Sequence, residues 1–215
     1  MKERTQNFID EFFGRHSDLA PLQDQILQAC SILISAFQNG NKLLLCGNGG
    51  SCADCDHIAG EFLKGFLLKR PVNEELKNKM AEQYGETGKD IAGKLQQGLP
   101  TISLNTHSAA ISAFENDVDP ELTYAQQVLA YGKPGDVLIG ISTSGNAKNV
   151  AAAVMTANAL GLHTIGLTGK DGGKLAQFAE IPLIMPQCET YRIQEDHLAV
   201  YHLLCAVVES ELFDM

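Results

Sequence analysis

Residues 42–51 read KLLLCGNGGS, and this stretch decides the fold. The apolar run 42–46 is typical of a short buried strand, which passes through Gly47–Ser51 into a helix expected over residues 52–66. Glycines let the backbone approach a ligand closely, and the start of a helix presents free N–H groups at a positive dipole end. The stretch therefore predicts a strand–turn–helix unit able to bind an anion, although ordinary helix capping explains one such turn alone better.

Strand–turn–helix units recur along the chain. Further apolar strands are expected at residues 101–104, 136–141, 163–167 and 181–185. Further helices are expected near residues 107–115, over 122–131, from the turn that ends at Asn146 to residue 160, and over 190–213. Continuous apolar strands that alternate with helices predict a parallel sheet covered on both faces. We expect one α/β domain over residues 1–215, with N-terminal helices in residues 1–40.

The segment 70–99 interrupts this alternation. It is polar, contains few apolar residues, and is bounded by Pro71 and Pro100. We expect an insertion that forms either two short amphipathic helices or a mobile excursion. An insertion of this length is often functional.

The composition excludes several classes of protein. The chain has 16 Lys and Arg against 26 Asp and Glu, a formal net charge of −10, and no basic cluster, which argues against a nucleic-acid partner. The N-terminus lacks the apolar region of a signal peptide, and no apolar run is long enough to span a membrane. Several of the six cysteines lie in apolar runs that suit a reduced thiol, so we expect a cytoplasmic protein without a membrane partner.

A second turn, Ser142–Asn146, follows the strand at 136–141 and reads STSGN. Three hydroxyls and an amide at the start of a helix suit a phosphate monoester without requiring a lysine. Because the carboxyl ends of parallel strands meet at one edge of the sheet, the two turns together favour a phosphate site over simple helix capping.

Two helices contribute titratable side chains. His57 and Glu61 lie four residues apart and therefore share one helix face, where the pair can hold a divalent metal ion or act as acid and base. On the last helix, Gln194 and His202 differ by about 80° around the axis, so we expect them to point at one pocket. His197 points elsewhere and is interpreted as structural.

Two shorter motifs carry weaker signals. Cys52 and Cys55 form a C-x-x-C motif without a second copy, so helix packing is a better explanation than a zinc or redox site, although a helix start can acidify thiols. Asn116 and Asp117 precede Pro120, and taken alone they are typical of a turn or a helix cap.

Five collinear motifs together make the chain resemble the sugar isomerase (SIS) domain family, and within it the bacterial phosphoheptose isomerases. They are LLLCGNGGS (43–51), the helix of His57 and Glu61, DVLIGISTSGN (136–146), TIGLTGKDGGKLA (164–176) and RIQEDHLAVYHLL (192–204). The resemblance covers nearly the whole chain except residues 70–99. It implies a three-layer α/β/α sandwich with a five-stranded parallel sheet, assembled as a homotetramer with active sites at subunit interfaces.

The resemblance also implies an activity, the aldose–ketose isomerisation of sedoheptulose 7-phosphate to D-glycero-D-manno-heptose 7-phosphate. The residues that it implies as substrate contacts are Asn48, Gly49, Gly50, Asn116 and Asp117, and those that it implies as phosphate ligands are Ser142, Thr143 and Ser144, with Ser51 close by. It implies a zinc site formed by His57, Glu61, Gln194 and His202. We expect Glu61 to act as the base and His202 as the acid, with Gln194 as a neutral ligand or a contact that orients the sugar.

The chain departs from the family pattern at three places. Ala147 stands where a further phosphate-binding serine is usual, Gly65 replaces a common basic residue beside Lys64, and residues 70–99 replace a short loop. These departures leave two alternatives open, a non-catalytic phosphosugar-binding or protein-binding regulator on the same fold, and an isomerase for another phosphosugar. The expected ligand set suits zinc and also accepts manganese, nickel or iron.

Overall fold

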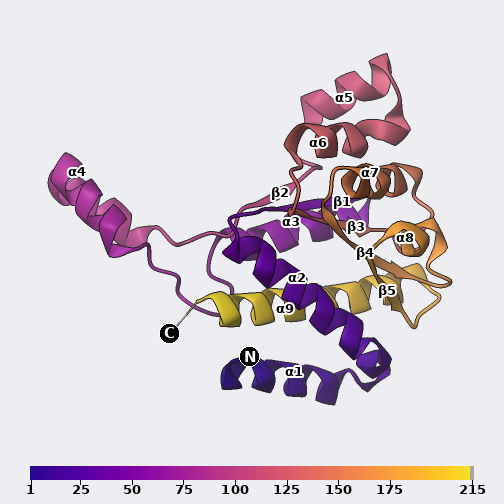
Figure 1. The fold of residues 1–215 in the computed structure, drawn as a ribbon, viewed down its shortest axis with the longest axis horizontal. Helices are drawn as coiled ribbons and strands as arrows, with labels where there is room; N and C mark the ends of the chain where they lie inside the picture. Colours follow the sequence, from indigo (N-terminus) through magenta and orange to yellow (C-terminus); the bar gives the residue numbers. More distant parts are fainter. Residues whose placement is uncertain (214–215) are drawn as a thin grey trace.

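One five-stranded, all-parallel sheet forms the centre of the computed structural model, which describes residues 1–213 (Figure 1). The strands, in spatial order, are β2 (Thr101–Ser103), β1 (Leu43–Gly47), β3 (Val137–Ile141), β4 (His163–Gly169) and β5 (Ile181–Met185). The α/β class and all five strands are thus confirmed, with ends that differ from the expected ones by at most two residues. Residues 214–215, where the expected domain ends, lie outside the described residues.

The strands that follow β1 are added to the sheet on both of its sides. Both β2 and β3 pair with β1, so the chain first extends the sheet on one side of β1 and then on the other. In open parallel sheets, ligands bind outside the carboxyl ends of the strands at such a reversal. The boundary between β1 and β3 is therefore the place where the topology favours a site.

Helices cover both faces of the sheet. One face carries α2 (Gln23–Gln38), α3 (Gly50–Leu63) and α9 (Thr190–Leu212), and α1 (Glu3–Arg15) lies against α9 on the side away from the sheet (Figure 1). The other face carries α6 (Thr123–Tyr131), α7 (Lys148–Ala159) and α8 (Gly173–Phe178). In β1, Leu43 and Leu45 enter the first core while Leu44 and Cys46 enter the second, as expected for a strand buried on both faces.

Two elements connect β2 to α6 outside this sandwich. The helix α5 (Ser108–Asp117) contains no buried residue and, with a short 3-10 turn over Pro120–Leu122, stands above α6 in Figure 1. The short helix α8 and a 3-10 segment over Ser17–Leu22 were not expected, because six residues are too few to show a helical period.

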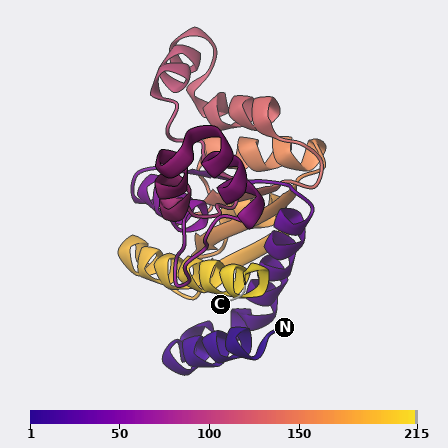
Figure 2. The ribbon, with the colours of Figure 1, turned by 90° about the vertical axis from the view of Figure 1, so that its left-hand side faces the viewer.

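The inserted segment forms a helical hairpin that projects from the body of the molecule (Figures 1 and 2). Its helix, α4 (Glu74–Lys94), bends at Gly85, which has φ 59° and ψ −140°. The two arms meet at small residues, since Gly88 and Ala92 are buried. Of the two forms expected for this segment, the structure contains the pair of short helices.

No helix among residues 1–213 combines the length and apolar character needed to cross a lipid bilayer.

Candidate active site

Two turns lie side by side at the carboxyl edge of the sheet. Gly47, at the end of β1, is in register with Ile141, at the end of β3. The turn after Gly47 leads into α3 on one face of the sheet, while the turn over residues 142–147 leads into α7 on the other. Both helices therefore begin at the strand reversal, where their N-terminal N–H groups favour an anion.

A pair of amides joins the two turns. Asn48 Nδ2 donates to Asn149 Oδ1 at 2.9 Å, and Asn149 Nδ2 donates back to Asn48 Oδ1 at 3.0 Å. The hydroxyl of Tyr124 lies 2.7 Å from the carbonyl oxygen of Gly47 and 3.2 Å from Asn48 Oδ1. Asn149 and Tyr124 were not predicted. The position of Asn149 in the first turn after STSGN was a usable signal, whereas nothing in the sequence points to Tyr124.

The turn over Ser142–Asn146, which carries three hydroxyls, has a backbone shape that depends on glycine. Gly145 has φ 66°, and a Cβ added there would come within 1.9 Å of the Gly172 carbonyl oxygen, so only glycine fits. Ser144 Oγ accepts from the backbone N–H of Asn146 at 3.2 Å. Ser142 and Ser51 are buried, while Thr143 and Ser144 are half-buried. The hydroxyls that remain accessible therefore belong mainly to Thr143 and Ser144.

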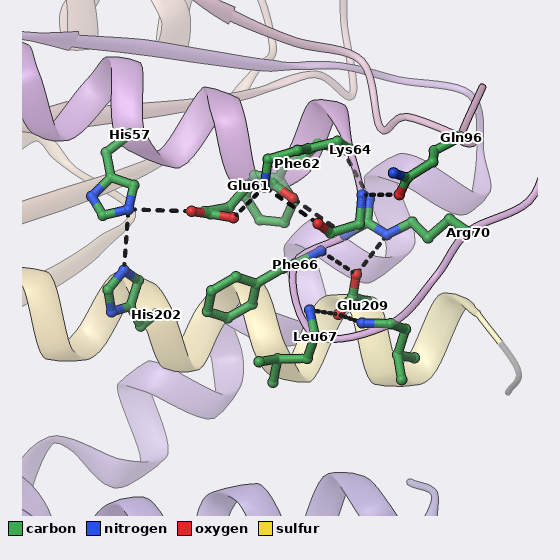
Figure 3. A network of polar contacts seen from close by, with 12 residues as sticks. His57, Glu61, Phe62, Lys64, Phe66, Leu67, Arg70, Gln96, His202 and Glu209 are labelled. Atoms are coloured by element: carbon green, nitrogen blue, oxygen red, sulfur yellow. Dashed lines mark hydrogen bonds and ion pairs between the residues drawn. The ribbon is translucent and has the colours of Figure 1, made fainter. Parts of the chain in front are cut away.

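A second group of predicted residues meets where α3 passes α9 (Figure 3). His57 Nε2 lies 3.2 Å from Glu61 Oε1 on the same helix and 3.5 Å from His202 Nε2 on α9. The Glu61 carboxylate also forms an ion pair with Lys64, whose Nζ lies 3.1 Å from Oε2. The structure thus brings together His57, Glu61 and His202, and adds Lys64 beside the position where Gly65 replaces a basic residue.

The environment of this group favours neutral imidazole at His202. Burial and the neighbouring His57 lower the pKa of His202, while the Glu61 carboxylate opposes this shift. The other ring nitrogen of His57, Nδ1, lies 2.9 Å from the hydroxyl of Tyr201, which is 3.3 Å from Asp54 Oδ1. Tyr201 therefore orients the His57 ring from behind, the part that outer partners of a metal-binding histidine usually play.

The donor types of these three side chains suit a zinc ion, and so do the two separations that involve His57. Donor atoms about 2.0–2.1 Å from a tetrahedral zinc ion lie about 3.3–3.4 Å from one another, close to the observed 3.2 Å and 3.5 Å. They are not a preformed cage, since no group of three His, Cys, Asp or Glu side chains in residues 1–213 is arranged to hold a metal ion as it stands. The side chains instead contact one another directly, in the space that an ion would take.

The fourth expected ligand, Gln194, lies elsewhere on α9. A Cβ on Gly50 would come within 2.2 Å of Gln194 Nε2, so this amide packs against the start of α3. The helical rise between Gln194 and His202 is about 12 Å. Gln194 is therefore next to the glycine turn, and the structure does not bring it to His57 and Glu61.

A cavity of about 560 Å³ reaches His202 from the side of α1. Its lining is mainly apolar and includes Phe8, Phe12, Phe66 and Leu198. The cavity does not include the two turns, so its chemistry differs from that of a phosphate site.

The sequence of the chain was compared with family models and with known proteins. A family model described as the SIS domain matches residues 7–87 and 80–169. The chain belongs to the SIS domain family. A phosphoheptose isomerase of Trichlorobacter lovleyi is 42% identical over 213 residues, which are 97% of this chain and 95% of the relative. A phosphoheptose isomerase of Clostridium acetobutylicum is 40% identical over 190 residues, covering 88% of this chain and 84% of the relative.

Solved structures give the same result for the SIS domain fold. The phosphoheptose isomerase of Neisseria gonorrhoeae has a TM-score of 0.72 and 32% identity, covering 97% of this chain and 98% of that one. The phosphoheptose isomerase of Francisella tularensis has a TM-score of 0.73 and 27% identity, covering 98% and 100% of the two chains. The resemblance found from the five motifs is thus confirmed.

Other predicted residues of this SIS domain lie apart from both groups. Asn116 and Asp117 are exposed at the end of α5, where Asn116 Nδ2 donates to Asp117 Oδ1 at 2.9 Å. His197 is buried and its Nε2 lies 3.2 Å from the Thr168 carbonyl oxygen, as expected for a structural histidine.

The cysteines at the start of α3 are not acidified. Burial raises the pKa of Cys52 and raises that of Cys55 well above 9, and nearby carboxylates add to both shifts. These raised pKa values agree with helix packing, the explanation that the sequence favours for the two cysteines, and not with the alternative of acidified thiols. All six cysteines are free thiols.

Proposed function

We propose that this chain is an aldose–ketose isomerase that interconverts sedoheptulose 7-phosphate and D-glycero-D-manno-heptose 7-phosphate. The observation that carries the proposal is that the relatives matched over nearly their whole length are phosphoheptose isomerases. The meeting of His57, Glu61 and His202 supports it, because isomerisation requires an acid and a base within reach of two adjacent carbons.

Glu61 is the base and His202 the acid in this proposal. Glu61 removes a proton from the carbon beside the carbonyl group and returns it to the neighbouring carbon, while His202 supplies a proton to the sugar oxygens. The side chain of Glu61 is 15% exposed, which leaves its carboxylate accessible to a substrate. The 3.5 Å contact between the two imidazoles keeps His202 close to Glu61 through their common neighbour His57.

The phosphate binds at the two turns, far from the reacting end of the sugar. Ser142, Thr143 and Ser144 with Ser51 hold the phosphate, and the substrate contacts are Asn48, Gly49, Gly50, Asn116, Asp117 and Gln194. Backbone N–H groups and hydroxyls bind a dianion without a basic surface, which agrees with a chain of net charge −10. Holding the distant phosphate fixes the reacting carbons against Glu61.

His57, Glu61, Gln194 and His202 hold one zinc ion in the proposed enzyme. Bound zinc would polarise the oxygens of the substrate and stabilise negative charge that develops on them. Two imidazoles and a carboxylate already lie at suitable separations, and Gln194 is the ligand that has to move.

We further propose that the protein acts in the cytoplasm as a homotetramer with sites at subunit interfaces. The apolar cavity beside His202 supports this, because a second copy would cover its open side. Leu63, Leu67 and Leu198 near the same site are 54%, 52% and 40% exposed in the single chain, a costly amount of apolar surface to leave in water.

A regulator that binds phosphosugars without turnover is the second candidate. The projecting α4 hairpin and the missing serine at Ala147 favour it. NMR of purified, zinc-supplied protein with sedoheptulose 7-phosphate separates the candidates. Appearance of the aldose supports the isomerase, tight binding without product supports the regulator, and turnover of only another phosphosugar in a substrate panel identifies a different isomerase.

A further inference from the structure

A fully buried ion pair joins the loop after α3 to Glu209, which lies about two helical turns past His202 on α9. Arg70 Nε lies 2.7 Å from Glu209 Oε1, and the two side chains are 0% and 1% exposed (Figure 3). A buried pair of this kind adds little to stability when compared with apolar residues of the same size. We therefore look for its role in the groups that the two side chains bind.

Glu209 binds the loop that follows α3. Its carboxylate accepts backbone N–H groups from Phe66 at 2.8 Å, Leu67 at 2.7 Å and Leu68 at 3.0 Å. With the bond from Arg70, four donors converge on one carboxylate, so the loop is fixed to α9 at this point.

Arg70 binds the end of α3. Its Nη1 donates to the carbonyl oxygen of Phe62 at 2.9 Å, and its Nη2 donates to the carbonyl oxygen of Glu61 at 3.3 Å. Carbonyl groups in the last turn of a helix have no partner within the helix. Arg70 therefore supplies partners to the turn that carries the proposed base, including the backbone of Glu61 itself.

The same loop touches the proposed acid. The ring of Phe66 stacks on the imidazole of His202 with the centroids 5.6 Å apart and the planes at 29°. Phe66 is also a residue whose N–H group Glu209 holds. One ion pair thus fixes the helix end beneath Glu61 and the aromatic ring against His202.

We propose that Arg70 and Glu209 are positioning residues, which set the placement of Glu61 relative to His202. The inference rests on the proposed function for the roles of those two residues. Misplacement of reacting groups by about 1 Å costs about 100-fold in rate. Loss of the ion pair should therefore lower kcat more than it raises KM, since the phosphate turns lie elsewhere.

The first test compares variants of this pair with a variant of another buried ion pair. Arg70→Lys and Glu209→Gln keep the size of the side chains but lose part of the hydrogen bonding. The control is Asp136→Asn, because Asp136 is 1% exposed and pairs with Lys42 just before the amino ends of β3 and β1, without a contact to the loop after α3 or to His202. Thermal unfolding and kinetics are measured at a temperature where all variants are folded.

We expect Arg70→Lys and Glu209→Gln to lower kcat about 10- to 100-fold with KM changed less than about threefold. Asp136→Asn should lower the melting temperature while keeping kcat within about twofold of the wild type. Wild-type kcat in the folded Arg70→Lys and Glu209→Gln proteins would overturn the proposal, as would an equal loss of kcat in Asp136→Asn.

The second test does not depend on turnover. Phe66→Leu leaves Arg70 and Glu209 intact and removes the ring from the face of His202. The ring protons of His202, assigned by their absence in His202→Gln, should shift in Phe66→Leu and also in Arg70→Lys. Unchanged His202 signals in folded Arg70→Lys overturn the positioning role, whereas shifted signals in a protein without isomerase activity contradict only the proposed function.

Discussion

His57 Nε2 on α3 and His202 Nε2 on α9 lie 3.5 Å apart, although 145 positions separate the two residues. Two lone pairs at this distance repel each other unless a proton or a cation lies between them. Glu61 adds negative charge on the same side, 3.2 Å from His57 Nε2. The three side chains therefore form a site whose donor atoms suit a metal ion.

Replacing Glu61 by glutamine tests the base. Glu61→Gln keeps the shape of the side chain but cannot accept a proton, so kcat should fall about 100- to 10,000-fold while the phosphosugar still binds. Exchange of the substrate C–H for deuterium in heavy water, followed by NMR, measures the proton transfer directly.

The exposed pair of His163 and Glu180 provides the control. Their side chains lie 2.8 Å apart, with His163 at the amino end of β4, and have the same chemistry as His57 and Glu61 without belonging to their group. Glu180→Gln should leave kcat unchanged. Near-wild-type exchange in Glu61→Gln would show that another group removes the proton.

Removal of metal ligands should affect zinc binding unequally. His57→Ala removes a donor that already lies beside Glu61 and His202, so zinc affinity should fall by more than about 100-fold, the upper range for changes to outer partners. Gln194→Ala should lower affinity by no more than about tenfold, because its amide packs against Gly50. Competition with a chromogenic chelator at fixed pH measures both values.

Equal losses in His57→Ala and Gln194→Ala would show that Gln194 moves fully into the zinc site. His163→Ala is the matched control, because this histidine is exposed at the amino end of β4 and pairs with Glu180, not with the proposed zinc ligands.

The sequence predicts the sheet better than the site because burial leaves a local signal. Each strand is an apolar run, and each predicted turn follows from a few adjacent residues, so β1, β3 and the turns after them could be found directly. The contact between Arg70 and Glu209 joins residues 139 positions apart, and neither residue stands in a motif. The same holds for the ring of Phe66 against His202, since stacking depends on how a loop returns to α9.

Gln194 shows a second limit of sequence reasoning. Its angle around α9 relative to His202 suggested one shared pocket, but angle alone ignores about 12 Å of helical rise. The pairing of His57 with Glu61 was predicted more safely, because positions four apart are neighbours both around and along a helix.

Restoring the missing serine should strengthen the phosphate turn. Ala147 is the N-cap of α7 and has no side chain able to accept from the free N–H groups of the first turn. Ala147→Ser should add about 0.5–1 kcal/mol to the free energy of unfolding and lower KM by adding a hydroxyl beside Ser144. Ala152→Ser, the same change inside α7, should do neither. An unchanged KM in a stabilised Ala147→Ser protein would show that phosphate binds away from this turn.

Buried His197 should make the fold sensitive to acid. Burial lowers its pKa from 6.5 to about 4, with a smaller opposing effect of the bond to the Thr168 carbonyl oxygen. Below about pH 6.5 the unfolded chain binds a proton at this residue while the folded chain does not. The full contribution of His197 to the free energy of unfolding is therefore present above pH 6.5, and it declines as the pH falls toward 4. The total loss is on the order of 3 kcal/mol.

His197→Gln keeps an N–H donor for Thr168 but removes the titration. Urea unfolding from pH 7.5 to 4.5 should show a smaller decline in the free energy of unfolding for this variant than for the wild type. His163→Gln changes an exposed histidine and should keep most of the wild-type decline. Parallel declines in His197→Gln and the wild type would mean that His197 is protonated in the folded protein, and that acid acts through other groups.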